Sequence, residues 1–472
     1  MVEIIEKTIK RLFWVPFALG MIGYRVVIGL PFLYSVYASL ANYFVNPVTD
    51  ETNGWILAAQ LLAVVVTTTF LLYALGDLWV RLKHLWINCF GDSVCVYGDG
   101  EAARTYADSL KHGYLCADIT QKREFRSRDH VFLYEDEQTA LRAYESRAKA
   151  LKDKRIFMGL QQLDPFLLRD SQGADIHFFN VYEMMAREYW KQHDLFDEIV
   201  SQQEEISIAI PVFNDAGEAI FRCGYLYNVY ALPQKITYHL WGCSSLQAEF
   251  LRQLPTENGD VICVHENDWA QDIDLISTMS RIIITSDDAL PMIQELLLRR
   301  QELSIHYYAP VRLGYDSILK APALLEFGNR KDILTDDNIR RERLQRQAKL
   351  INYDYSLRMD GRPCPDTYET EMEDAWKSLD GFLKGSNAAR ADHYRIEKRL
   401  RELGLPNETL WEIEHIRWCR FHRLNHWEYA PVRDKAARKH PFLVPYEDLA
   451  QEEKEKDGFY DDRVRGMVEE LL

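Results

Sequence analysis

The chain has 472 residues, of which 47% are hydrophobic, and a formal net charge of −16 at pH 7. This length suits about three domains, and the apolar fraction excludes wholesale disorder. The acidic balance argues against a nucleic-acid partner, because phosphate binding relies on a surplus of lysine and arginine. The eight cysteines stand singly along the sequence, which indicates reduced thiols rather than a disulfide framework.

Two uncharged segments near the N-terminus predict a transmembrane hairpin, with a pair of buried core helices as the alternative. Residues 26–44 and 55–76 contain no charged side chain, and about 20 helical residues cross a hydrocarbon core about 30 Å thick. The connecting residues 46–54 hold two acids and no base, whereas lysine and arginine flank the hairpin at its other end. The positive-inside rule therefore predicts a multi-pass protein of the inner or cell membrane with both termini in the cytoplasm.

Residues 1–90 form the expected membrane domain, whose first segment is typical of an amphipathic helix lying in the interface. Arg25 and Asp77 fall at the same cytoplasmic end of the hairpin, where we expect them to form an ion pair. The connecting residues contain no sequence resembling a potassium-selectivity filter. Conduction through this domain would therefore require an oligomeric bundle of hairpins.

Residues 93–118 have the layout of a nucleotide-binding βαβ unit. An apolar run leads to Gly98, Asp99 and Gly100, a helix-forming stretch follows, and Asp118 comes next. The glycines permit a tight turn, the amides at the helix start can bind phosphate, and the acid can bind a ribose hydroxyl. We therefore predict a cofactor site for a nucleotide or an NAD-like dinucleotide at these four residues. Glycines kept only for packing are the alternative.

This turn, the sequence RIFMGLQQLDP and the sequence GADIHFFNVYEMMARE resemble the TrkA-N, or RCK, regulatory domain. The resemblance implies regulation of potassium or other cation transport by bound nucleotides or ions. Short β-branched runs separated by helical stretches continue from residue 205 and predict a second α/β unit, whose turn at residues 212–217 lacks paired glycines. The expected boundaries are 91–200 for the first Rossmann-like domain, 201–315 for a degenerate second one and 316–384 for a helical linker without strands.

The C-terminal part predicts two helices. Ser386 is the expected N-cap of the first, which ends at Gly404 and Pro406, and Asn407 caps the second over residues 408–424. On the second helix an aromatic and imidazole stripe runs beside an aliphatic face; it consists of Trp411, His415, Trp418 and His422.

Three interpretations of this stripe compete. A metal site would use His415, His422 and His426, but no HExxH motif is present. A plain aromatic core would bury these rings. A ligand site would use Trp418 and Trp427 as stacking faces, with histidine and arginine as donors to a phosphate.

The sequences SNAARADH, EHIRW, HWEYAPVRD, HPFLVPYEDL and EKEKD follow in order and resemble the RyR domain, a small helical module of ryanodine receptors and of prokaryotic proteins. The resemblance implies an all-α domain at residues 385–472 that senses a nucleotide-derived signal, in defence systems among other settings. It also implies a ligand pocket walled by Glu414, His415, Trp418, Trp427, Tyr429, His440, Pro445 and Tyr446.

The whole chain is thus expected to be multidomain: a transmembrane helical hairpin, tandem Rossmann-like units and a small RyR domain. We expect a membrane-anchored, non-enzymatic sensor without catalytic or metal-binding residues, in which a nucleotide-like ligand rearranges a homo-oligomer of hairpins. One alternative is a TrkA-N-type regulator of cation transport. The other is a nucleotide-processing membrane enzyme, which the absence of a nucleophile–base motif disfavours.

Overall fold

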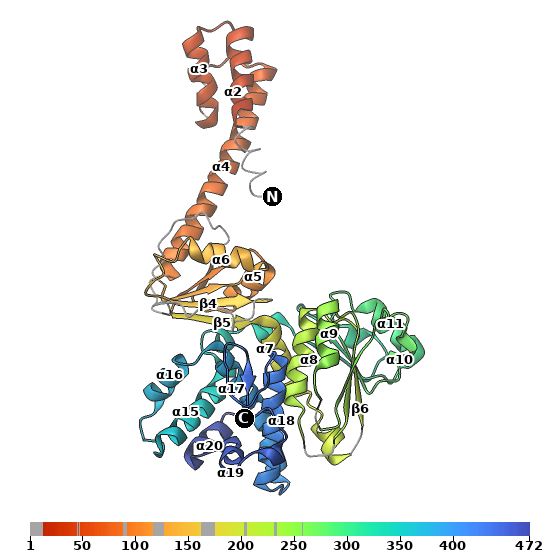
Figure 1. The fold of residues 1–472 in the computed structure, drawn as a ribbon. Coiled ribbons are helices and arrows are strands. Elements are labelled where there is room, and N and C mark those ends of the chain that lie inside the picture. The colour runs from red at the N-terminus through yellow and green to blue at the C-terminus, as the bar shows by residue number, and fades with distance from the viewer. Residues whose placement is uncertain are drawn as a thin grey trace. The chain divides into compact units, whose positions relative to one another are not determined.

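The computed structural model describes residues 13–44, 46, 48–87, 92–116, 127–161, 175–202, 205–230, 234–256 and 258–472. The chain forms two compact units, Met1–Gly91 and Asp92–Leu472, called unit 1 and unit 2 below. Unit 1 is helical, and unit 2 combines two parallel sheets with a C-terminal helical region (Figure 1).

The first helix of unit 1 is interrupted. The elements are α2 (Trp14–Met21), the π-helical turn η1 (Ile22–Val27), α3 (Phe32–Ala41), the 3-10 turn η2 (Asn42–Phe44) and α4 (Gly54–Ile87). Gly29 adopts a left-handed φ of 84°, and Pro31 precedes α3. The expected span at residues 26–44 is therefore not one helix. Among the described residues, one helical segment, Gly54–Leu72, is long and apolar enough to cross a membrane.

The helices of unit 1 approach one another through small residues. A Cβ atom on Gly20 would lie 2.9 Å from the Ser39 hydroxyl, and one on Gly23 would lie 2.6 Å from Ile56. The buried interior also contains Ser35, Ala38, Ala41, Ala59 and Ala63. Arg25 donates to the Leu30 carbonyl at 2.8 Å. The side chain of Asp77 lies outside the described residues, so the predicted pair with Arg25 stays a prediction.

The first sheet of unit 2 has five parallel strands in the order β2-β1-β3-β4-β5. Its elements are β1 (Val94–Tyr97), α5 (Glu101–Ser109), β2 (Gly113–Cys116), β3 (Asp129–Phe132), α6 (Glu137–Glu145), β4 (Arg155–Leu160), β5 (Asp175–Asn180) and α7 (Val181–Gln192), followed by the π-helical turn η4 (Asp197–Ser201). The strand order reverses between β1 and β3, which is where doubly wound sheets place their ligands.

The second sheet has six parallel strands in the order β11-β10-β9-β6-β7-β8. Its elements are β6 (Ile206–Ile210), α8 (Asp215–Tyr227), β7 (Ile236–Leu240), α9 (Ser245–Gln253), β8 (Val261–Val264), α10 (Ile273–Ile276), β9 (Arg281–Ile284), α11 (Leu290–Arg299), β10 (Ile305–Tyr308), α12 (Tyr315–Ile318) and β11 (Leu324–Phe327). This is the complete dinucleotide-fold order, although the unit lacks the glycine turn. β11 shows that the prediction of no strand after residue 315 is wrong.

The remaining elements form a helical body. They are α13 (Arg330–Ile333), α14 (Asp336–Ile339), η5 (Arg343–Gln345), α15 (Arg346–Asp360), α16 (Glu369–Lys377), α17 (Gly381–Glu402), α18 (Asn407–Leu424), the pair β12 (Glu428–Tyr429) and β13 (Lys439–His440), η6 (Tyr446–Asp448), α19 (Gln451–Lys454), η7 (Glu455–Asp457) and α20 (Asp462–Glu469). Leu357, Trp376, Tyr394 and Val464 share one core. The expected linker therefore contributes α15 and α16 to the same body as α17 and α20.

Helix α17 begins earlier than expected. The Asp380 carboxylate accepts the Leu383 amide at 2.8 Å and caps the helix, so Ser386 lies inside it and is not the N-cap. The other end agrees with the prediction: α17 ends at Glu402, and Gly404 takes a left-handed φ of 87°. Helix α18 ends at Leu424 as predicted, but it begins at Asn407 with Pro406 in the N-cap position and no side-chain cap, so the prediction that Asn407 is the N-cap is wrong.

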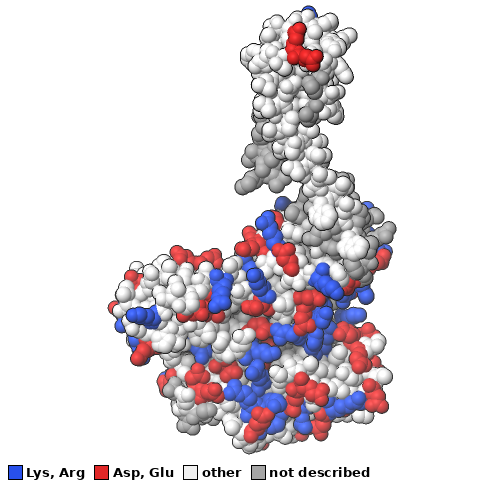
Figure 2. Space-filling model, turned by 180° about the vertical axis from the view of Figure 1, so that it is seen from behind, with Lys and Arg blue, Asp and Glu red and all other residues white. Residues whose placement is uncertain are grey.

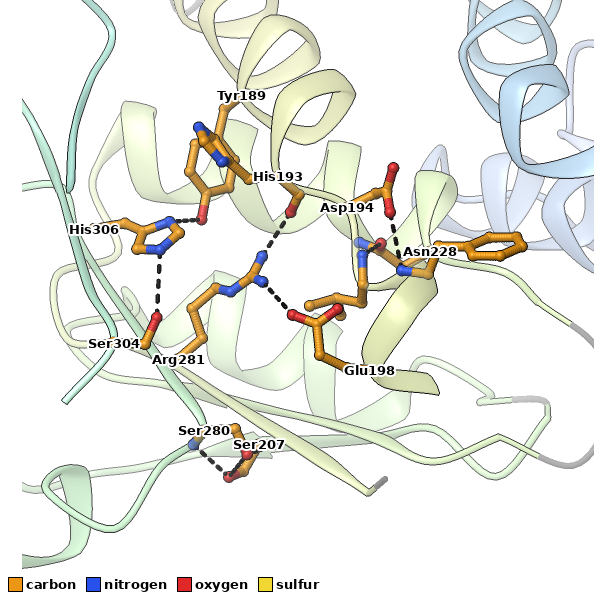
Figure 3. A network of polar contacts seen from close by, with 12 residues as sticks. Tyr189, His193, Asp194, Glu198, Ser207, Asn228, Ser280, Arg281, Ser304 and His306 are labelled. Carbon is orange, nitrogen blue, oxygen red and sulfur yellow. Dashed lines mark hydrogen bonds and ion pairs between the residues drawn. The ribbon is translucent and has the colours of Figure 1, made fainter. Parts of the chain in front are cut away.

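Polar contacts fasten the two α/β units of unit 2 to each other (Figure 3). The guanidinium of Arg281 in β9 donates to the His193 carbonyl at 2.6 Å and to Glu198 at 2.9 Å. The Tyr189 hydroxyl and a ring nitrogen of His306 in β10 lie 2.6 Å apart. The C-terminal end of α7 and the residues after it are thus fixed to the amino ends of β9 and β10 in the second sheet.

An ion pair without solvent exposure joins α18 to the second sheet. Arg420 donates to the Asp260 carboxylate at 2.7 Å and to the Tyr225 carbonyl at 2.9 Å, and both charged side chains are 0% exposed. The guanidinium also lies 4.2 Å from the centre of the Tyr225 ring. Asp260 in turn accepts the Ile236 amide at 2.9 Å.

Replacing Arg420 by alanine should lower the free energy of unfolding by about 3–5 kcal/mol, because Asp260 would remain buried without its partner. Chemical denaturation of the full chain in detergent measures this loss. The exposed pair Lys235–Glu205 is the control: Lys235→Ala should cost at most about 1 kcal/mol. Equal effects of the two substitutions would contradict the structural role of the buried pair.

Candidate functional site

The aromatic stripe of α18 packs into a cluster of rings. Trp418 contacts His422 with ring centres 3.8 Å apart and His440 at 4.9 Å. Trp427 stacks on Phe382 of α17 at 5.1 Å. His415 lies 5.8 Å from Trp418 and 6.0 Å from Tyr446. The structure therefore brings together five of the eight predicted pocket residues: His415, Trp418, Trp427, His440 and Tyr446.

The two tryptophans do not face each other across an open slot. His422 lies between them, 3.8 Å from Trp418 and 5.4 Å from Trp427. Trp427 is only 7% exposed and shares a core with Cys419 and Leu443. The imidazole of His422 therefore occupies the space that a sandwiched base would need.

Burial keeps the histidines of the cluster neutral. It lowers the pKa of His422 to about 3, that of His440 to about 4 and that of His415 below its usual range. A ring nitrogen of His415 lies 2.9 Å from the Val444 carbonyl, which accepts a hydrogen bond from the neutral ring. Neutral rings attract a phosphate less strongly than charged ones, so the ligand-free cluster does not favour these histidines as phosphate donors near neutral pH.

The other three predicted pocket residues take no part in these ring contacts, although Tyr429 is the strand partner of His440. Glu414 is buried against α17 and accepts two hydrogen bonds from Arg417, both 2.8 Å long. Burial opposes ionisation, but the charges of Arg417 and Arg390 and the hydrogen bond from His393 outweigh it and hold the pKa of Glu414 well below its usual range. Tyr429 and Pro445 are exposed. The described residues contain no group of three histidine, cysteine or acidic side chains placed to hold a metal ion.

The chain itself fills the space beside the predicted cofactor turn. A Cβ atom on Gly98 would lie 2.2 Å from the Leu133 carbonyl oxygen, and one on Gly100 would lie 2.6 Å from a carboxylate oxygen of Glu135. Close packing against backbone alone thus requires Gly98, whereas the Glu135 side chain could move away from a residue at Gly100. The Glu135 charge repels a phosphate placed at Gly100. Asp99 lies in this turn, and Asp118 lies outside the described residues.

A cavity of about 1050 Å³ lies at the junction of the three parts of unit 2. Its walls come mainly from β5 and α7 of the first α/β unit, α8 of the second, and α15, α16 and α17 of the helical body. Phe421 and Asn425, near the end of α18, also line it. None of the eight predicted RyR pocket residues is among the lining residues.

Three helices line this cavity with residues of their first turns. Glu183 of α7 and Asp215 and Glu218 of α8 are acidic, whereas α17 has no acid in its first turn and contributes Lys384. The ammonium of Lys384 lies 5.9 Å from the centre of the Trp376 ring, which also lines the cavity. The Asp380 carboxylate already caps the start of α17, so the groups on the wall suited to a negative ligand group are the ammonium groups of Lys377 and Lys384.

Two polar atoms on the wall lack a hydrogen-bond partner within the described chain. They are the hydroxyl oxygen of Tyr227, whose side chain is only 4% exposed, and the side-chain oxygen of Gln345. A buried polar atom without a partner costs about 1–3 kcal/mol. Both residues line the cavity, but the two atoms are themselves covered in the ligand-free chain, so a ligand reaches them only when the wall rearranges.

Much of the charge on the wall is already paired. Arg187 binds the Asp392 carboxylate through two nitrogens, at 2.6 and 3.0 Å. His177 lies 2.8 Å from Glu342, which Lys349 also contacts at 3.0 Å. Burial alone would raise the pKa of Glu342, but His177 and Lys349 outweigh it and lower the value to about 2.

Sequence reasoning missed this cavity because no motif marks it. Its lining residues run from Gln161 to Asn425, and each helix contributes ordinary residues at helical spacing. The signal that could have drawn attention to it is the number of charged residues, such as Arg187 and Asp392, on helix faces that also carry apolar side chains.

Replacing Trp427 by alanine should lower the free energy of unfolding by about 3–5 kcal/mol, because the substitution leaves a cavity in the ring cluster. Calorimetry of the full chain in detergent measures the effect. Tyr429→Ala is the matched control, since Tyr429 is 57% exposed, and should change stability by less than about 0.5 kcal/mol. An unchanged melting temperature for Trp427→Ala would support an open binding slot instead.

Acid should destabilise the ring cluster. In the folded chain the pKa of His440 is about 4, below the usual value near 6.5, so the unfolded chain binds a proton more readily. The contribution of His440 is complete above about pH 6.5 and is lost as the pH falls towards 4. His440→Gln should therefore flatten the fall in melting temperature over this range. An unchanged pH profile in the variant would count against a neutral, buried His440.

The RyR domain family matches residues 396–471, which include α18 and the ring cluster apart from Phe382. No curated protein and no solved structure matches the chain. The predicted resemblance of the C-terminal part is therefore confirmed for these residues, while the resemblance of the first α/β unit to TrkA-N domains stays a prediction. Residues 396–471 are thus a RyR domain. Two α/β units, each with a sheet of parallel strands, precede it in unit 2.

Proposed function

We propose that the chain is a membrane-anchored ligand sensor, in which a nucleotide-derived ligand binds unit 2 and changes the arrangement of the membrane helices. The observation that carries this proposal is the cavity at the junction of both α/β units and the helical body. Pockets for small ligands typically enclose about 300–1000 Å³ and combine apolar walls with a few polar groups. This cavity has that size and character.

The surface of unit 1 supports the membrane part of the proposal. The described residues on the visible face of unit 1 are almost all uncharged, whereas the visible face of unit 2 carries both signs of charge throughout (Figure 2). Large apolar side chains point outward, including Val26, Leu33 and Phe44, while serine, alanine and glycine lie in the interior beside Tyr24 and Ile56. Helices associate in lipid through such small residues. The proposal retains two crossings with both termini in the cytoplasm.

The lining of the cavity offers a partner for each part of a nucleotide. Lys377 and Lys384 suit a phosphate, and Trp376 and Phe421 offer apolar ring faces for a base. Carboxylates such as Asp215 can accept hydrogen bonds from ribose hydroxyls. Acids outnumber lysine and arginine among the lining residues by seven to five, so a ligand with one phosphate fits better than one with three.

The position of the cavity allows a bound ligand to change how the parts of unit 2 are arranged. A ligand there contacts α7, α8 and α17 at once, and these helices belong to different parts of unit 2. It shifts their arrangement only if it binds one arrangement more tightly than another. Regulation through the glycine turn of the first sheet is less favoured, because Glu135 lies against Gly100.

Tyr227→Phe should weaken binding of the responding nucleotide about 2- to 10-fold, because a buried hydroxyl that gains a ligand partner contributes about 0.5–1.5 kcal/mol. Isothermal titration of the full chain in nanodiscs with adenosine, AMP, ATP and NAD measures this. Stability without nucleotide should not fall, since the hydroxyl has no partner in the described part of the chain.

Two matched variants make this experiment decisive. Tyr446 and Tyr134 also have buried hydroxyls without a partner among the described residues; Tyr446 belongs to the predicted RyR pocket and Tyr134 to neither site. Weaker binding in Tyr446→Phe but not in Tyr227→Phe would place the ligand in the ring cluster. Equal binding by all three variants would remove the case for the cavity.

A further inference from the structure

Helix α4 carries a regular, mainly apolar stripe that the proposed sensing function does not use. Its residues follow one another at alternating spacings of four and three, namely Leu57, Leu61, Val64, Thr68, Leu71, Leu75, Leu78, Leu82 and Leu85. This spacing is the a and d pattern of a left-handed coiled coil, sustained over four heptads. We call these nine residues the α4 seam.

The seam has no partner within the described part of unit 1. Its seven leucine and valine residues from Leu57 to Leu82 are each at least 38% exposed, and Thr68 is exposed as well. The side chain of Leu85 lies outside the described residues. The packed face of α4 is a different one, on which Ile56, Ala59 and Ala63 are buried.

The length of α4 shows why the seam needs a cover other than lipid. The helix has 34 residues and is therefore about 51 Å long at 1.5 Å per residue. The apolar segment Gly54–Leu72 already matches a hydrocarbon core of about 30 Å. Leu75, Leu78 and Leu82 lie beyond it, about 50% exposed, on a part of the helix that also contains Asp77, Arg81 and Lys83.

We propose that the α4 seam binds the same seam of a second copy of the chain, in a parallel coiled coil that continues from the membrane into the cytoplasm. Knobs-into-holes packing requires a partner helix with the same repeat, and α4 of another copy has that repeat in register. Copies inserted in one membrane share their orientation, so their α4 helices run parallel. The interface requires no ligand and is independent of the cavity.

Cysteine scanning of the full chain in native membranes tests the seam. Single cysteines at Leu71, Leu75, Leu78 and Leu82 should form intermolecular disulfides on mild oxidation, at least about five-fold above the wild-type chain with its native cysteines. The control is Val80→Cys, on the opposite side of the heptad, which should stay at the wild-type level. The proposal is overturned if the cross-linking yield at Val80 equals that at the seam positions. It is also overturned if the yields do not follow the alternating spacings of four and three residues.

A second measurement guards against chance collisions. Leu78→Lys with Leu82→Lys should lower the dimer fraction at least about ten-fold in single-molecule photobleaching of nanodisc-embedded chains, whereas Val80→Lys should leave it unchanged. A wild-type chain that is monomeric in this measurement overturns the proposal. So does a disulfide that joins the thiol introduced by Leu78→Cys to a native cysteine of the same chain, since the seam would then be covered from within.

Discussion

The buried pair of Arg420 and Asp260 fixes how the RyR domain is attached to the rest of unit 2. Both side chains have lost all contact with solvent, and such a loss is tolerated only when charges and hydrogen bonds are matched in position. The Tyr225 carbonyl and ring, and the Ile236 amide, supply the additional contacts. Helix α18 is therefore set against α8 and the edge of the second sheet in one arrangement, and the RyR domain is not a freely tethered module.

This attachment explains why the aromatic stripe of α18 is packed and the cavity lies elsewhere. With α18 held against the second sheet, Phe382 of α17 covers Trp427, and the neutral rings of His422 and His440 fill the remaining space. Burial of neutral imidazoles costs far less than burial of charged ones. The cavity lies between α17, α7 and α8, and Arg187 and Asp392 join α7 to α17 beside it.

The sequence predicted those parts of the structure that local patterns determine. Strand and helix periodicity gave both α/β units, and Gly404 correctly marked the end of α17. The sequence did not predict the strand Leu324–Phe327, because four residues in a charged region are too few to show strand periodicity. Composition could not separate a tryptophan that stacks on a ligand from one that stacks on Phe382. Arg187 and Asp392 are 205 positions apart, and only the folded chain shows that they meet beside a cavity.

The free energies of the ion pairs in unit 2 decide which contacts between its elements a bound ligand can break. Coupling between a ligand and a distant site is typically worth about 1–3 kcal/mol. Breaking the fully buried pair at Arg420 would cost more, about 3–5 kcal/mol. Lys349 and Glu373 on the cavity wall also form a pair, 2.8 Å apart, but Glu373 is 41% exposed, and pairs open to water are worth about 0–1 kcal/mol. In the proposed mechanism, the pair of Lys349 and Glu373 is therefore a weaker contact for a ligand to break than the buried pair of Arg420 and Asp260.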